Sequence, residues 1–173
     1  MTGIDPPALS LFFHPMDEPA VRAIARWRYD PPYDLYSLDG ADVQELIQGF
    51  LHPEYHYYQI RDEAGELVAY CCFGADARVP GGDYPAGALD VGLGVRPGLT
   101  GQGLGIAFVR AVLDFARRTF ATPVLRVTLA EFNQRAQRVW QQAGFRPIQT
   151  FERAPDGLVF VILVLEVNTP VRP

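Results

Sequence analysis

The sequence predicts a mixed α/β (α+β) domain in which most strands pair antiparallel. Its 173 residues are 49% hydrophobic and 20% charged, which suits one ordinary hydrophobic core. Strand-like and helix-like periodicities follow one another in the order β-α-α-β-β-β-α-β-α-β-β. The chain shows neither a linker nor an internal repeat, so we treat residues 1–173 as a single domain.

The N-terminal third is expected to form a strand, two helices and an aromatic loop. Residues 9–13 are apolar enough for a strand, and Asp17 before Glu18 and Pro19 indicates a helix start, with the helix running to about Arg28. Residues 29–36 contain two prolines and three tyrosines, which predicts a loop. Residues 41–50 place apolar side chains at i, i+3, i+4 and i+7, as in an amphipathic helix.

The middle of the chain is expected to pass from a hairpin to a third strand and a long helix. Residues 55–61 and 67–73 form the hairpin, and residues 74–88 make a glycine- and proline-rich connection. In residues 89–95, apolar side chains alternate with Asp90, Gly92 and Gly94, so one face of this strand carries little bulk. Interior strand glycines often mark the close approach of a ligand or another backbone. The helix that follows runs to about Phe120.

The C-terminal part is expected to add a strand, a helix and a final hairpin. Residues 124–129 read as a strand, Asn133 is a good N-cap, and Gly144 is placed to end the next helix. Residues 147–153 and 158–167 form the hairpin. The second of these strands is apolar on both faces, which predicts a central strand or a strand covered by a second subunit. A homodimer is therefore one expectation.

Composition excludes several partners and sites. The net charge of −5 and the pI near 5.1 give no attraction to nucleic acid or to an anionic membrane. No apolar run reaches the length of a membrane span, and the N-terminus lacks the blocks of a signal peptide, so we expect a cytoplasmic protein. Cys71 and Cys72 are adjacent in a strand and should stay reduced on opposite faces. The three histidines do not have metal-ligand spacing, so we expect no metal.

Residues 98–105 (GLTGQGLG) form a glycine-rich turn between a strand and a helix. Such a turn gathers backbone N–H groups at the positive end of the helix dipole, where phosphates bind. The turn has no Walker-A lysine, and Ile106 stands where the dinucleotide fingerprint needs its third glycine. A nucleotide-binding domain is therefore disfavoured, while a turn that only allows close helix packing stays open as an alternative.

The turn has a wider context that is more specific. Val95-Arg96-Pro97, the run from Thr100 to Gly105, and then Asn133, Ala136, Trp140 and Gly144-Phe145 together resemble the GNAT superfamily of acyl-CoA-dependent N-acetyltransferases. The resemblance is strongest over residues 89–145 and extends to the whole order of elements. It implies a GNAT-like sheet flanked by helices, in which the strands at 89–95 and 124–129 splay apart.

The resemblance also implies acetyl-CoA as co-substrate, with its pantetheine arm in the gap between these strands and its pyrophosphate on the turn. The residues it assigns to cofactor binding are Leu93, Val95, Thr100, Gly101, Gln102, Gly103, Leu104, Gly105, Asn133 and Trp140. Two departures from the family pattern stand out. Thr100 replaces a common Arg or Gln, and Trp140 replaces a tyrosine that commonly protonates the departing thiolate. Trp140 as a wall of the core and Asn133 as a cap alone are the structural alternatives.

The implied reaction is direct attack by a primary amine in a ternary complex. An amine of pKa about 10.4 is neutral in only about one part per thousand at pH 7, so a proton acceptor helps. Asp90 is the first candidate base, with a structural hydrogen bond as its alternative role, and Glu131 is the second. The backbone N–H near Val95 matches the family's donor to the thioester oxygen.

The acceptor is expected to be a small-molecule or peptide amine. By resemblance, Trp27, Tyr29, Tyr33 and Tyr36 border its pocket, although aromatic residues of this kind also serve for packing alone. Aromatic faces would suit an acceptor with an apolar or cationic portion. The alternative function is a non-catalytic acyl-CoA-binding or sensing module, favoured by Trp140 and by the lack of a compelling base.

Overall fold

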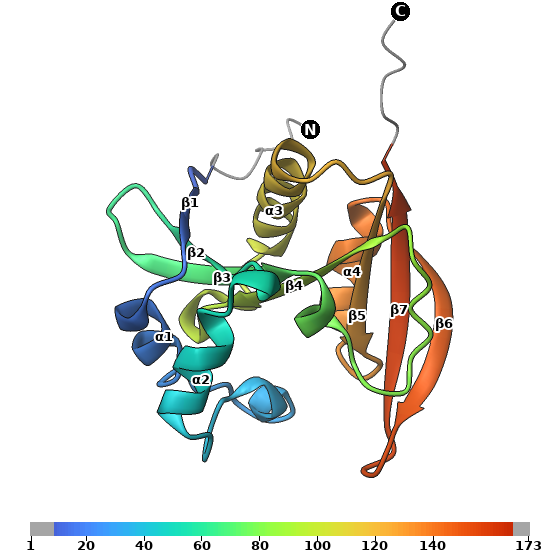
Figure 1. Ribbon diagram of the computed structural model, residues 1–173, viewed down its shortest axis with the longest axis horizontal. Helices are drawn as coiled ribbons and strands as arrows, with labels where there is room; N and C mark the ends of the chain where they lie inside the picture. Colours follow the sequence, from blue (N-terminus) through green and yellow to red (C-terminus); the bar gives the residue numbers. More distant parts are fainter. Residues whose placement is uncertain (1–8, 168–173) are drawn as a thin grey trace, which may run out of the picture.

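A computed structural model describes residues 9–167 as one seven-stranded sheet with helices on both faces (Figure 1). The strands are β1 (Phe12–Pro15), β2 (Tyr58–Arg61), β3 (Leu67–Phe73), β4 (Leu89–Val95), β5 (Val124–Ala130), β6 (Arg146–Arg153) and β7 (Leu158–Glu166). The α-helices are α1 (Glu18–Ile24), α2 (Val43–Phe50), α3 (Gly105–Thr119) and α4 (Gln134–Gln142). Short 3₁₀ helices lie in the connections: η1 (Tyr33–Tyr36), η2 (Pro53–Tyr55), η3 (Ala75–Ala77) and η4 (Pro97–Leu99). The predicted mixed, mostly antiparallel architecture is confirmed.

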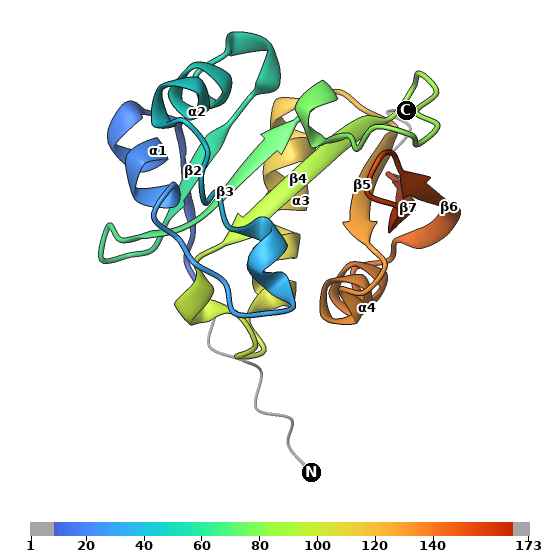
Figure 2. The same ribbon diagram turned by 90° about the horizontal axis from the view of Figure 1, so that it is seen from below.

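The sheet has the strand order β1-β2-β3-β4-β5-β7-β6, and only β4 and β5 pair in parallel. Their register covers three residues each, from Leu89↔Leu125 to Val91↔Val127. Beyond Val91 the two strands diverge, as Figure 2 shows. The expected splay of the central strands is therefore present. β7 pairs with β5 on one side and β6 on the other, which confirms it as an interior strand.

Three hydrophobic clusters hold the layers together. The largest packs α3 and α4 on one face of the sheet and includes Phe73, Val112 and Trp140. The second packs α1 and α2 on the opposite face, around Val21 and Phe50. The third lies on that same opposite face over β5 to β7, where loop residues such as Tyr84 cover it. The two faces of β4 thus meet different surroundings, with apolar residues toward α3 and Asp90, Gly92 and Gly94 toward the other side.

Local sequence signals explain most helix starts. Asp17 caps α1 by accepting from Ala20 N at 2.9 Å, and Asp42 caps α2 through Gln44 N. The predicted cap at Asn133 is confirmed, because its Oδ1 accepts from Ala136 N at 3.0 Å. Cys71 and Cys72 are both free and buried, as predicted.

Several boundaries differ from the sequence prediction. β2 begins at Tyr58 and not at residue 55, because residues 53–55 form η2. α1 ends at Ile24 and not near Arg28, because the amides of Arg26 and Trp27 bond three residues back and tighten the last turn. The first strand begins at Phe12, where pairing with β2 begins, and not at Leu9. The aromatic loop is not wholly irregular, since η1 forms directly after its prolines.

Candidate active site

The divergence of β4 and β5 leaves unpaired backbone groups on β4. Asp90 O accepts from Gly74 N, and Arg96 N donates to Val68 O, so even-numbered residues of β4 direct their amide groups toward β3. In an extended strand the alternate residues point the other way, so Leu93 and Val95 direct theirs into the gap. The gap therefore offers a strand edge on which an extended ligand can add as another strand does.

The turn that follows β4 presents free amides at the start of α3. Gly101 and Gly103 have φ angles of +73° and +76°, a left-handed conformation that favours glycine. Leu104 occupies the N-cap position without a side-chain hydrogen bond. In the described part of the chain, the amides of residues 101–106 donate to no recorded partner. The turn is therefore a site for an anion at a helix N-terminus.

Arg135 is a neighbour of this turn that sequence reasoning missed. Its Nη1 lies 3.2 Å from the position a Cβ would take on Gly101, and its guanidinium stands 4.3 Å from the centre of the Tyr33 ring. Arg135 lies in the first turn of α4, where the helix dipole favours acidic residues. A basic residue at this electrostatically unfavourable position is the sequence signal from which an anion site could have been predicted.

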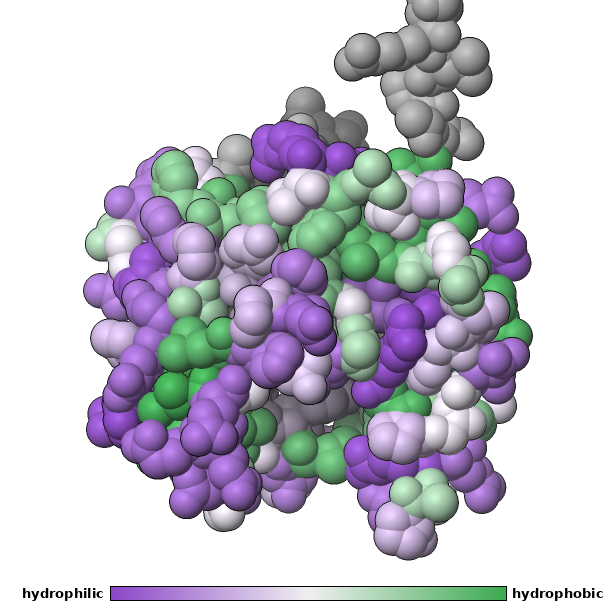
Figure 3. Space-filling model, viewed as in Figure 1, coloured by the Kyte–Doolittle hydropathy of each residue, from purple (hydrophilic) through white to green (hydrophobic). Residues whose placement is uncertain are grey.

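The aromatic loop crosses the gap from one strand to the other. The Tyr29 hydroxyl donates to Val95 O at 2.7 Å, and Asn133 Nδ2 donates to the Tyr36 hydroxyl at 3.1 Å. The two tyrosine rings meet edge to face at 6.4 Å between centroids. Burial raises the pKa of Tyr29 to about 12, so its hydroxyl stays protonated at neutral pH. Figure 2 shows η1 between β4 and α4. Figure 3, which has the same view as Figure 1, shows a hollow at the lower centre of the molecule.

The four aromatic residues expected at the acceptor pocket fall into two groups. Tyr33 and Tyr36 both pack against Phe132, at 6.0 and 6.3 Å between ring centroids. Trp27 packs instead against Tyr70 of β3, at 5.9 Å. Tyr29, Tyr33 and Tyr36 are thus brought together at the gap, while Trp27 belongs to the neighbouring cluster under α1 and α2.

Asp90 lies where the two strands are still paired. It is 2% exposed, and Arg126 on β5 holds it through Nε–Oδ1 at 2.6 Å and Nη2–Oδ2 at 2.8 Å. Arg78 Nε adds a third contact at 2.8 Å. Both carboxylate oxygens are occupied by guanidinium donors and enclosed, so an amine has no access to them. The geometry matches the structural role considered for Asp90 and not the role of a base.

Glu131 and Trp140 occupy contrasting positions. Glu131 is exposed just after β5, and its backbone amide donates to Val159 O at 2.9 Å. Trp140 is 4% exposed and packs edge to face on Phe145, at 5.0 Å between ring centroids. Its indole therefore forms part of the core beneath the gap.

Gly92 and Gly94 make room for side chains of the neighbouring strand. A Cβ on Gly92 would lie 2.7 Å from Cys72 Sγ, and one on Gly94 would lie 2.4 Å from Tyr70 Cε1. The low bulk on this face of β4, which the sequence linked to the cofactor, is thus taken up by β3. The feature of β4 that remains for a ligand is its backbone edge.

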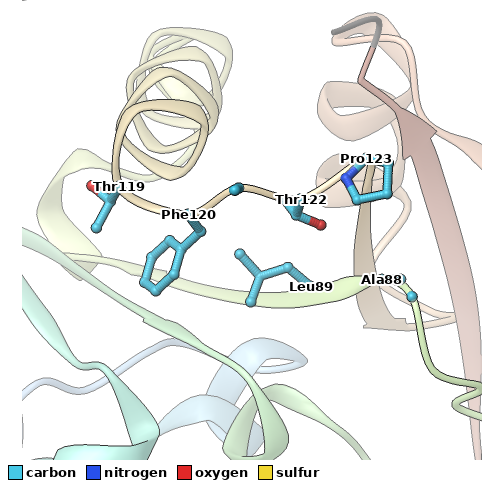
Figure 4. A pocket seen from close by; sticks show the side chains of 8 residues that line it. Ala88, Leu89, Thr119, Phe120, Thr122 and Pro123 are labelled. Atoms are coloured by element: carbon cyan, nitrogen blue, oxygen red, sulfur yellow. The ribbon is translucent and has the colours of Figure 1, made fainter.

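A pocket with a volume of about 490 Å³ lies away from the gap, between the N-terminal end of β4 and the segment joining α3 to β5 (Figure 4). It is lined by residues 87–89 and 119–123, none of which carries a charge. Among residues 9–167, no group of three or more His, Cys, Asp or Glu side chains could hold a metal, and no helix could span a membrane. We therefore locate the candidate site at the gap.

Comparison with known proteins assigns this architecture. The sequence profile of the acetyltransferase (GNAT) family matches residues 21–145. The chain belongs to the GNAT family. The strand gap, the glycine turn and the N-cap of α4 all lie within the matched residues. The chain is a GNAT acetyltransferase. A comparison with curated protein sequences found no match.

Solved structures show the same GNAT fold. A spermidine N-acetyltransferase chimera from Vibrio cholerae and hSSAT has a TM-score of 0.73 at 12% identity, covering 90% of this chain and 95% of that one. The aminoglycoside acetyltransferase AAC(6')-Ib in complex with coenzyme A has a TM-score of 0.70 at 18% identity, covering 91% and 95%. The acetyltransferase yncA from Salmonella typhimurium, with its cofactor acetyl-CoA, has a TM-score of 0.63 at 17% identity, covering 94% and 97%.

Proposed function

We propose that this protein transfers an acetyl group from acetyl-CoA to a primary amine by direct attack within a ternary complex. The observation that carries the proposal is the combination of a strand gap with unpaired amides and an uncapped helix start directly beside it. Acetyl-CoA has a long arm that contains amides, followed by a diphosphate. The arm can pair with the free edge of β4, and the diphosphate can bind at the start of α3, which follows β4 along the chain.

The residues present fit acetyl-CoA. The turn residues Thr100, Gly101, Gln102, Gly103, Leu104 and Gly105 would hold the pyrophosphate, with Arg135 as an added positive charge. Leu93 and Val95 would pair with the pantetheine arm through their backbone. Because Val95 O accepts from Tyr29 in the structure, the Tyr29 hydroxyl must share or yield this acceptor. Asn133 would meet the cofactor beside its capping role, and Trp140 would line the gap from the core.

The proposed transfer proceeds by direct attack of the amine on the thioester. A neutral amine attacks the thioester carbonyl, a C–N bond forms, and the C–S bond breaks. One amine proton leaves to a base or water before attack, and a second ends on the departing thiolate. The amide N–H of Val95 would stabilise the charge that develops on the carbonyl oxygen. Glu131 is the base candidate that stays accessible, since Asp90 is enclosed by its arginines.

Small-molecule amines are the acceptor class that the comparisons support. Two of the similar structures are a spermidine N-acetyltransferase and an aminoglycoside acetyltransferase. A peptide amine stays within the proposal, as do a cytoplasmic location and a homodimer. The alternative, a non-catalytic acyl-CoA sensor, is favoured by one observation, the buried Trp140 where the family commonly has a tyrosine hydroxyl.

The experiment is a pair of substitutions in one loop, Gly103→Val and Gly98→Val. Gly103 has a positive φ and lies in the anion site, whereas Gly98 has an ordinary φ and open space around it. Acetyl-CoA should raise the melting temperature of the parent and of Gly98→Val but not that of Gly103→Val. Absence of a shift in the parent contradicts the proposal. Thiol release with a panel of amines then separates an enzyme from a sensor, which binds without turnover.

A further inference from the structure

Three tyrosines and one cysteine form a row over the Gly92–Gly94 face of β4, leading away from the gap. Tyr29 stands at Val95, Tyr70 lies across Gly94, and Cys72 lies across Gly92. Tyr57 continues the row, with its ring 6.3 Å from that of Tyr70. Burial raises the pKa of Tyr70, and the nearby Tyr29, Cys72 and Asp76 raise it further, which agrees with their closeness.

The row ends at a carboxylate. The Tyr57 hydroxyl donates to Asp76 Oδ2, and no hydrogen bond to Oδ1 is recorded within residues 9–167. Asp76 is exposed in η3, which covers Gly92: a Cβ there would lie 3.6 Å from Ala77 Cβ. The Tyr57 ring is itself fixed, since it stacks on Phe50 at 4.3 Å. The carboxylate is therefore oriented by a rigid phenol and keeps one oxygen open.

Asp76 differs from Asp90 in its electrostatic surroundings. Asp90 is neutralised by Arg126 and Arg78, whereas Asp76 takes part in no ion pair within the described part of the chain. Asp76 is thus an uncompensated negative charge at the end of a row of phenols that leads to the gap. Such a site favours a cation, which gains a charge-assisted hydrogen bond from the carboxylate and electrostatic attraction from the aromatic rings.

We propose that Asp76, oriented by Tyr57, is the specificity-determining residue for a second positive charge on the acceptor. The inference rests on the proposed acetyl transfer and names its substrate class as a diamine. The reacting nitrogen lies at the gap beside Val95, and the second ammonium lies at Asp76, near Gly92. Val95 and Gly92 are three strand residues apart, which is about 10 Å along β4. An extended aliphatic diamine spans that distance along the phenols of Tyr29 and Tyr70.

The test compares 1,6-diaminohexane with n-hexylamine, which has the same chain length and one charge fewer. The parent should prefer the diamine in kcat/KM by about 4- to 10-fold, which combines a factor of about two for its two equivalent amines with the roughly 2- to 5-fold worth of a charge pair at an exposed carboxylate. In Asp76→Asn this preference should fall to about two, which is the statistical ratio for two equivalent amines against one, and Asp76→Glu should restore part of it. Tyr57→Phe, which frees the carboxylate, should lower the preference to an intermediate value. Asp114→Asn, at an exposed acid on α3, should leave the preference intact.

Binding gives a second readout that does not need turnover. Calorimetry with 1,6-diaminohexane should show weaker binding to Asp76→Asn than to the parent, in a variant whose melting temperature confirms folding. An unchanged diamine preference in Asp76→Asn overturns the inference and leaves acetyl transfer standing. Failure of the parent to bind the diamine also overturns it. Failure to bind acetyl-CoA overturns the proposed function, so the two failures are distinguishable.

Discussion

Replacement of Arg126 by alanine should destabilise the protein more than any surface charge change. The guanidinium is 2% exposed and makes two hydrogen bonds to Asp90 and a third, at 3.0 Å, to Pro85 O. Its removal leaves the enclosed Asp90 carboxylate with only Arg78, whose side chain is 40% exposed. Breaking a buried pair from one side costs about 3–5 kcal/mol. For a chain of this size, that lowers Tm by roughly 6–20 °C.

Urea and thermal unfolding followed by circular dichroism measure this loss. Arg78→Ala is the matched control, because a half-exposed partner is worth about 1 kcal/mol or less. The paired change Asp90→Leu with Arg126→Met should recover stability to within about 2 kcal/mol of the parent, since the only charge that loses its partner is Arg78, whose side chain is 40% exposed. A loss below about 1 kcal/mol in Arg126→Ala, or no recovery in the paired variant, would refute the reasoning.

Three further outcomes follow from the same contacts. Asn133→Ala should cost about 0.5–2 kcal/mol in thermal unfolding, whereas Asn133→Asp, which keeps the cap but loses the donor to Tyr36, should cost less; equal losses would contradict the capping role. Burial raises the pKa of Cys72 from 9.0 to about 12, so iodoacetamide at pH 8 should label it about a thousandfold more slowly than a free thiol, and labelling at the free-thiol rate would count against this packing. In the folded protein the pKa values of Tyr29 and Cys72 are both raised to about 12, from ordinary values of 10.0 and 9.0. Their contribution to the free energy of unfolding is therefore complete below pH 9 and is lost as pH rises toward 12. Urea midpoints that do not fall between pH 8 and pH 11 would contradict this expectation.

The sequence was informative where a signal is local. β4 and the start of β5 were predicted at their observed residues, because alternation and glycine spacing are properties of one segment. The caps at Asp17 and Asn133 were predicted for the same reason. The glycine turn between β4 and α3 was visible for the same reason, and its role in cofactor binding stays a prediction.

Contacts between distant segments could not be predicted in this way. Asp90 and Arg126 are 36 positions apart, and only the parallel register of β4 and β5 makes them partners. The Tyr29 hydroxyl reaches Val95 across 66 positions, whereas its own sequence context indicated only a loop. The role proposed for Asp76 depends equally on η3 folding over Gly92.

The divergence of β4 and β5 also bears on how the protein behaves in a crowded solution. Unsatisfied strand edges are the places where sheets of different molecules join and aggregate. Here two such edges face each other inside one fold, and the contacts of Tyr29 with Val95 and of Tyr36 with Asn133 lie across the gap between them, which hinders pairing with a neighbouring copy. The gap therefore favours pairing of the free backbone groups with a narrow, flexible ligand over pairing with a strand of another protein molecule.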